Sequence, residues 1–147
     1  MTKVRGSLAP LLWDKEKPKV LFIGLNPSTA DETEDDRTIR RCIGFAKRWG
    51  YGAILVGNLF GIRSTNPANI YAVKDPIGPE NDAILLKMAQ EAKLIVAAWG
   101  NSGVYLNRSL RMRSFFPEMK CLGLNVTGEP KHPLYVRANQ ELIVLDN

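Results

Sequence analysis

The sequence predicts an α/β fold, a three-layer α/β/α sandwich around a central, mainly parallel four-stranded sheet. Four short apolar runs are continuous rather than alternating, which is typical of strands covered on both faces of a parallel sheet. Segments with helical spacing separate these runs, and right-handed crossovers join parallel strands in such an order. The length of 147 residues suits one domain, which we expect to span residues 1–147.

The predicted strands are rich in aliphatic and β-branched residues. In chain order they cover residues 19–23, 53–56, 93–98 and 120–124. Residues 139–145, at the end of the chain, are compatible with either a short helix or an edge strand. The order of elements is therefore β-α-β-α-β-α-β, followed by one short segment.

One helix is expected between each pair of consecutive strands. The first has apolar residues at helical spacing, with Asp35 or Asp36 placed to cap it and Gly50 to end it. The second is predicted over residues 81–92 and the third over residues 102–116, where a proline stops it.

Composition and cysteine content indicate a globular cytosolic protein. Apolar residues make up 45% of the chain and charged residues 24%. No apolar run reaches the roughly 18 to 20 residues that cross a bilayer, and the N-terminus does not resemble a signal peptide, so we expect a cytoplasmic protein without a membrane partner. Cys42 and Cys121 are expected to be buried thiols. The single histidine argues against a bound metal, and no cofactor is expected.

The charge balance favours a polyanionic partner, DNA or a nucleotide. The formal net charge is +5, and clustered cations gain affinity by releasing counterions from phosphates. Arg37, Arg41 and Arg48 share a helix face, which is either a solvated surface or a phosphate-binding stripe. Arg63, inside a loop after the second strand, is the better candidate for a phosphate contact. The sequence leaves the oligomeric state open.

Each predicted strand is followed by a polar, turn-rich loop. These loops cover residues 24–29, 58–67, 99–102 and 125–133. In an open α/β sheet, ligands bind beyond the carboxyl ends of the strands, where such loops converge. We therefore expect one shared pocket at this edge of the sheet.

The first loop has the composition of a binding turn. Gly24 permits close backbone approach, Asn26 can donate and accept, Pro27 stiffens the turn, and Ser28 and Thr29 supply hydroxyls. The alternative is a plain strand-to-helix turn in which the polar side chains satisfy backbone groups.

Three other side chains are candidates for chemistry in this pocket. Asp31 follows the first loop and is either a general base for water or part of an acidic helix start. Trp99 either stacks on a planar ligand or packs in the core. His132, the only histidine, follows the fourth strand and is interpreted as a hydrogen-bond donor or acid, although many lone histidines are structural.

These loops, in this order, resemble the motifs of the uracil-DNA glycosylase superfamily. Residues 24–28 are similar to the Gly-x-Asn-Pro-Gly motif of its mismatch-specific branch, with Ser28 in place of the last glycine. Elsewhere in the superfamily a strand ends in an asparagine, with an arginine five positions later. Asn58 and Arg63 are similar to these two residues, and Asn66-Pro67 continues the match. The closing His-Pro-Ser motif is matched in part by His132-Pro133-Leu134.

Nearly the whole chain is also identified as a member of a bacterial and phage family known only as a domain of unknown function. The blocks that carry this match are Leu25-Asn26-Pro27-Ser28-Thr29-Ala30-Asp31, Thr38-Ile39-Arg40-Arg41-Cys42, Trp49-Gly50-Tyr51, Asn58-Leu59-Phe60, Ala98-Trp99-Gly100 and His132-Pro133-Leu134-Tyr135.

The glycosylase resemblance implies a DNA-repair reaction on a uracil-like or modified base that is flipped into the pocket. Asn58 would read the edge of the base, and Phe60 or Trp99 would stack on it. Asn26 would position the attacking water, and His132 would stabilise negative charge on the departing base. The resemblance implies no metal. An asparagine is a weak base, so a site with Asn26 alone would be slow unless Asp31 assists.

The same resemblance implies contacts with the rest of the nucleic acid. Asn101 and Tyr135 join the expected substrate-binding residues, and the segment 134–137 would approach the duplex with a wedge side chain. Lys131 and Arg137 are the expected nucleic-acid contacts. Two alternatives stay open: a hydrolase or transferase that acts on a free nucleoside or nucleotide, and a non-catalytic module that binds nucleic acid or protein.

Overall fold

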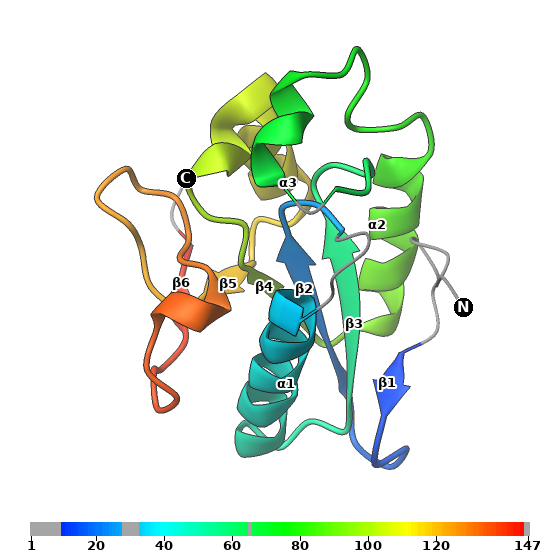
Figure 1. The fold of residues 1–147 in the computed structure, drawn as a ribbon. Coiled ribbons are helices and arrows are strands. Elements are labelled where there is room, and N and C mark those ends of the chain that lie inside the picture. The colour runs from blue at the N-terminus through cyan, green and yellow to red at the C-terminus, as the bar shows by residue number, and fades with distance from the viewer. Residues whose placement is uncertain (1–9, 28–32, 65, 146–147) are drawn as a thin grey trace.

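The computed structural model describes residues 10–27, 33–64 and 66–145 (Figure 1). The strands are β1 Leu11–Leu12, β2 Lys19–Gly24, β3 Ala53–Asn58, β4 Leu94–Ala97, β5 Lys120–Cys121 and β6 Ile143–Val144. The α-helices are α1 Thr33–Arg48, α2 Asn81–Glu91 and α3 Arg108–Phe115. Three 3-10 helices complete the described elements: η1 Pro67–Tyr71, η2 Asn101–Asn107 and η3 Pro133–Tyr135.

The α/β class is confirmed, but the sheet is larger than the four strands predicted. It has six strands in the order β1-β3-β2-β4-β5-β6. The pairs β3–β2, β2–β4 and β4–β5 are parallel, whereas β1 and β6 add antiparallel edges, so the sheet is mixed. Strand β6 lies within residues 139–145, for which the sequence left a short helix or an edge strand open, whereas β1 has only two residues and is too short for a recognisable pattern.

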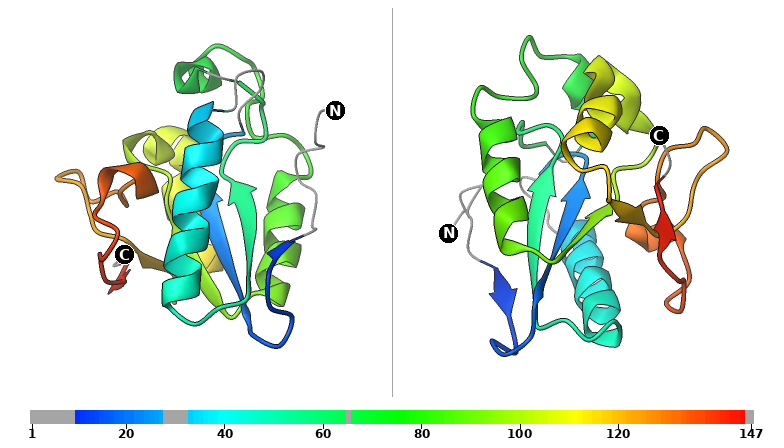
Figure 2. Two further views of the ribbon diagram at one scale, coloured as in Figure 1. Left: turned by 60° about the horizontal axis from the view of Figure 1, so that its bottom comes forward. Right: turned by 180° about the vertical axis from the view of Figure 1, so that it is seen from behind.

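Helices cover both faces of the sheet (Figure 2). Val20 and Phe22 of β2 pack with residues of α1, whereas Leu21 and Ile23 pack with residues of α2 and α3. This alternation explains the continuous apolar run of β2, because both sets of its side chains are buried. The described helices include none that is long and apolar enough to span a membrane.

The helix boundaries agree with the prediction in part. The first helix begins at Thr33 and stops before Gly50, whose φ of +89° suits glycine at a helix C-terminus. The second lies where it was expected. The prediction of a single third helix is wrong. This segment is divided into η2 and α3, because Leu106 and Asn107 take positive φ values of 54° and 57°.

The register of the parallel strands brings their carboxyl ends to the same level. Gly24 of β2 pairs with Asn58 of β3, and Ile23 of β2 pairs with Ala97 of β4. The loops that follow these three strands therefore leave the sheet side by side. Cys42 and Cys121 are both buried with no disulfide between them, as expected, and burial raises the pKa of the Cys121 thiol.

Candidate functional site

A cavity of about 330 Å³ lies at the carboxyl edge of the parallel strands, and we call it the polar cavity. The sequence-predicted residues that line it are Gly24, Asn26, Asn58, Trp99, Asn101, His132 and Tyr135. Apolar side chains of the sheet and of α1 complete its walls, including Phe22, Ile39, Cys42 and Val56. The loops after β2, β3, β4 and β5 thus contribute to one space.

The Asn26 side chain is held by its amide nitrogen. Nδ2 lies 3.3 Å from the Pro27 carbonyl oxygen, 3.4 Å from that of Ile62 and 3.3 Å from that of Ser64. Three carbonyl acceptors identify this atom as the nitrogen, because the amide oxygen would be repelled there. Within the described part of the chain, no group is bonded to Oδ1. The amide is therefore fixed, with its acceptor left for a ligand or a water.

Asn58 ends β3, and its backbone is anchored. The Asn81 side chain donates from Nδ2 to the carbonyl oxygens of Asn58 and Leu59, at 2.8 and 3.0 Å. The Asn58 side chain itself has no hydrogen bond with another described residue. It lies so close to Gly24 that a Cβ at this glycine would be 3.1 Å from Asn58 Oδ1. An alanine at position 24 would crowd this amide, which would have to shift by a few tenths of an ångström.

His132 has a defined tautomer. Its Nδ1 accepts a hydrogen bond of 3.1 Å from the backbone N–H of Leu134, which caps the start of η3. A ring nitrogen that accepts carries no proton, so the neutral imidazole has its proton on Nε2. Tyr135 lies beside this ring, with 5.6 Å between the ring centroids, and is 76% exposed. His132 can therefore act as a hydrogen-bond donor through Nε2.

Trp99 belongs to the wall of the cavity and to the core at once. Its side chain is only 2% exposed, and Nε1 donates to Glu129 Oε1 at 2.8 Å. Glu129 is itself buried, and its Oε2 lies 3.6 Å from Arg113 Nη2. Of the two interpretations of Trp99, these contacts support packing, because the polar atom of the indole is already used inside the protein.

Asn101 links the polar cavity to the loop after β5. Its Oδ1 accepts from Asn125 Nδ2 at 3.0 Å and from Thr127 Oγ1 at 2.6 Å. The carbonyl oxygen of Pro130 accepts from the backbone N–H of Gly100 at 2.9 Å in the same region. The loop after β5 is thereby held against the loop after β4.

Several expected site residues do not line the polar cavity. Phe60 is fully buried and packs against the Tyr105 ring, so we exclude it as a stacking residue. Arg63 is half-buried beside the cavity wall, and Lys131 and Arg137 lie outside the lining. Pro27 lines a neighbouring cavity instead. The expected residues Ser28, Thr29 and Asp31 lie outside the described residues.

The structure adds residues that the sequence did not single out. Thr38, Ile39 and Cys42 face the polar cavity from α1, and their spacing is that of the apolar helix face that predicted core packing. Ser64 also lines it, and its Oγ accepts from Asn69 Nδ2 at 2.7 Å. Ser64 is part of a loop that the sequence assigned to the pocket. Its burial could not be predicted from the sequence, because many loop serines are exposed.

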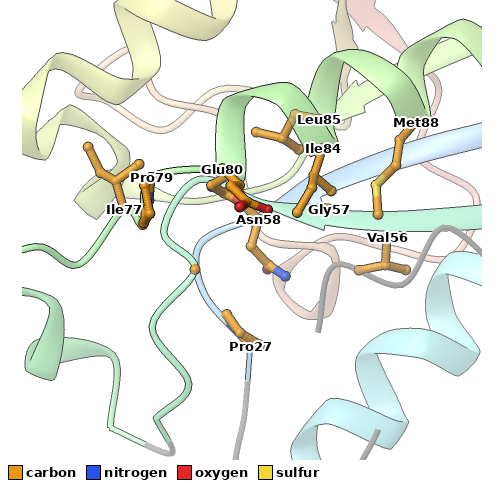
Figure 3. A pocket seen from close by; sticks show the side chains of 13 residues that line it. Pro27, Val56, Gly57, Asn58, Ile77, Pro79, Glu80, Ile84, Leu85 and Met88 are labelled. Atoms are coloured by element: carbon orange, nitrogen blue, oxygen red, sulfur yellow. The ribbon is translucent and has the colours of Figure 1, made fainter. Parts of the chain in front are cut away.

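A second cavity of about 300 Å³ lies between β3 and the start of α2, and we call it the apolar cavity (Figure 3). Its walls are mainly aliphatic, with side chains of Pro27, Val56, Ile77, Pro79, Ile84, Leu85 and Met88. Glu80 and Asn81 add polar groups. Val56 and Asn58 line both cavities, so the two spaces adjoin at the end of β3.

An ion pair between a buried arginine and a half-buried aspartate supports the same strand end. Arg108, 2% exposed, donates from Nε to the Leu59 carbonyl oxygen at 2.9 Å, and its Nη2 lies 2.7 Å from Asp82 Oδ1. Arg111 Nε lies 3.2 Å from Asp82 Oδ2. Burial alone raises the pKa of Asp82, but the two guanidinium groups outweigh it and hold that pKa below its ordinary value. Elements α2 and α3 thus position the residues that follow β3.

The described lining of neither cavity has the donor set of a metal site. Among the described residues, no group of three or more His, Cys, Asp or Glu side chains is arranged to hold a metal ion. The polar groups of the polar cavity are instead amides, an imidazole and hydroxyls. Such groups bind through hydrogen bonds, and they suit a neutral, planar ligand.

Comparison with known proteins identifies a family without an assigned activity. A family model described as "Protein of unknown function (DUF1643)" matches residues 11–134. This match confirms the family that the sequence blocks indicated. Searches of curated proteins and of solved structures found no match. The geometry of the chain itself therefore carries the functional argument.

Proposed function

The chain belongs to the DUF1643 family, a family of unknown function, and we propose that it is a DNA base N-glycosylase for a uracil-like or modified base. The observation that carries the proposal is the meeting of Asn26, Asn58 and His132 on one cavity of base-accommodating size. These are the residues to which the glycosylase resemblance assigned water positioning, base reading and leaving-group stabilisation.

In the proposed reaction, the target base leaves the DNA stack and enters the polar cavity. Asn26 Oδ1 accepts a hydrogen bond from a water, whose oxygen forms a bond to C1′ of the deoxyribose while the C1′–N bond breaks. The electron pair of that bond goes to the base. His132 Nε2–H donates to the base as this charge develops, and the water proton leaves to solvent. Asp31 remains the proposed assisting base.

Asn58 is the proposed reader of the base edge. Its amide offers one donor group and one acceptor, the pattern that matches the alternating edge of a uracil-like base. The hydrogen bonds of Asn81 to its backbone keep the side chain at the cavity edge. The proposal includes a glycosylase-like fold, and it is supported by the run of four parallel strands, β3-β2-β4-β5, whose loops carry the motifs in the expected order.

DNA is favoured over a free nucleotide as the partner. The described walls of the polar cavity contain no Lys or Arg side chain, so nothing there would pair with the phosphates of a nucleotide. A base can enter while its phosphates stay outside, within reach of Lys131 and Arg137 as proposed contacts. The net charge of +5 supports this arrangement.

The test is a single-turnover glycosylase assay on single-stranded and duplex oligonucleotides that carry uracil, hydroxymethyluracil or hypoxanthine. Wild type should produce alkali-labile sites, and Asn26→Ala and His132→Ala should each lower the rate at least ~10²-fold. Asn139→Ala, an exposed asparagine outside both cavities, is the matched control and should keep the wild-type rate.

Two results would contradict the proposal. One is the absence of cleavage by wild type on every substrate; if DNA binding is absent as well, turnover of a free nucleoside would favour the small-molecule hydrolase. The other is cleavage by Asn26→Ala and His132→Ala at the wild-type rate. DNA binding without any cleavage would favour the non-catalytic module.

A further inference from the structure

The apolar cavity has no part in the proposed reaction. A space of about 300 Å³ beside the end of a central strand is of the size that holds small ligands. Ile77, Ile84 and Met88 leave it unfilled (Figure 3).

The cavity lies where β3 is uncovered on its outer side. Strand β1 pairs only with Ala53 and Ile54, so the described chain places no strand beside the second half of β3. The wall on that side is instead formed by the start of α2 and the loop before it. The apolar cavity therefore opens beside the strand end that carries Asn58.

Asn58 connects this space to the polar cavity. Asn58 and Val56 are both among the lining residues of the two cavities. Because the Asn58 amide has no hydrogen bond with another described residue, it can turn toward a base without breaking an internal contact. A base read by Asn58 would thus have an aliphatic pocket directly beside its recognised edge.

The lining defines what the neighbouring space can take. Its aliphatic side chains favour an apolar stem. Glu80, which is exposed and forms no ion pair with a described residue, places a carboxylate at its rim. A carboxylate there favours a cationic or hydrogen-bond-donating end group.

We propose that the substrate base is enlarged by a flexible arm, which passes Asn58 and lies in the apolar cavity with an amino or similar donor group near Glu80. This inference rests on the proposed glycosylase function and specifies its substrate class. A uracil without an arm would leave the apolar cavity empty and would lack the binding energy that the arm supplies. An arm that is bound in the transition state raises the rate of base release as well as the affinity.

The experiment compares three single-stranded oligonucleotides that carry uracil, 5-propynyluracil or 5-(3-aminoallyl)uracil. Wild type should release the aminoallyl base at least ~10-fold faster than uracil, a ratio that a few buried atoms can supply. Propynyluracil, which has an apolar arm without the amine, should fall between them. Glu80→Gln should bring the aminoallyl rate down to the propynyl rate.

Two variants that fill the apolar cavity test its role directly. Ile84→Phe on α2 and Ile77→Phe in the preceding loop should each remove the preference for the aminoallyl base, as measured by the ratio of the two rates. Leu86→Phe is the matched control, since Leu86 lies on α2 but is exposed and outside the cavity. A melting curve for each variant verifies that it folds. If one of the two phenylalanine variants does not fold, the other still tests the cavity.

The outcomes separate this inference from the function on which it rests. Equal or faster release of uracil, or an unchanged preference in both filled variants, overturns the arm site and leaves the glycosylase intact. If no oligonucleotide is cleaved, the glycosylase proposal fails. A thermal-shift assay with free 5-(3-aminoallyl)-2′-deoxyuridine then tests whether the apolar cavity binds the arm. Stabilisation of wild type but not of Ile84→Phe supports the site, and no stabilisation of wild type overturns it.

Discussion

The two sides of the polar cavity treat their polar groups differently. On the side of β2 and β3, Asn26 keeps its amide oxygen and Asn58 its whole side chain unbonded to other described residues, while backbone contacts hold both in place. On the side of β4 and β5, Trp99 and Glu129 are buried and bonded to each other. The first side offers two amides that can bind a ligand, whereas on the second side Trp99 and Glu129 supply rigidity and His132 is the proposed hydrogen-bond donor. Lining a cavity is therefore a weaker indication of function than an unused polar atom.

The largest expected effect on stability comes from the rigid side. Trp99→Ala should lower the free energy of unfolding by about 3–5 kcal/mol, because it empties a large buried site. Asn58→Ala on the other side should change it by no more than about 0.5 kcal/mol, since no side-chain hydrogen bond to a described residue is lost. Urea denaturation measures both. Equal losses for the two variants would break the distinction between the sides.

A smaller loss is expected when only the partner of the tryptophan is removed. Glu129→Ala leaves the indole N–H of Trp99 and part of the Arg113 charge without their acceptor, which costs about 1–3 kcal/mol. Glu141→Ala is the control, because Glu141 pairs with Arg48 at the surface and should contribute about 0–1 kcal/mol. If urea denaturation shows a larger loss of unfolding free energy for Glu141→Ala than for Glu129→Ala, this account is contradicted.

The last expected effect is a pH dependence at the support of β3. The pKa of Asp82 is lower in the folded protein than its ordinary value of 3.8, so the folded state binds the proton less readily than the unfolded state. Its stabilising contribution is complete above that ordinary value and is lost as the pH falls through the folded pKa. The melting temperature of wild type should thus exceed that of Asp82→Asn near neutral pH, and the gap should narrow below about pH 4. A gap that stays constant into acid would contradict the role of the Arg108 pair.

Much of the candidate site could be predicted from the sequence, because its residues lie directly after the ends of the strands. Continuous apolar runs located the four central strands, and the loops after them brought Asn26, Asn58 and His132 to one edge. Phe60 shows the limit. The backbone N–H groups of Leu59 and Phe60 bond to the carbonyl oxygens of Gly24 and Leu25, at 2.9 Å each, so the chain continues beside the first loop and Phe60 enters the core.

Other differences came from features that leave no pattern in sequence. The two-residue edge strand β1 pairs through backbone groups, which any side chain permits. The break between η2 and α3 depends on left-handed conformations at Leu106 and Asn107, and leucine gives no indication of such a conformation. The apolar cavity joins residues from distant segments, so only the assembled fold shows that it adjoins Asn58.

The central claim is that the polar cavity releases a base from DNA by hydrolysis. Mass spectrometry of the products formed from an oligonucleotide with one 5-(3-aminoallyl)uracil or uracil tests it most directly. The account predicts two products, the free base and a strand of unchanged length with an abasic site, and His132→Ala should form both at least ~10²-fold more slowly. An unaltered oligonucleotide, or a base still attached to its sugar, would contradict it.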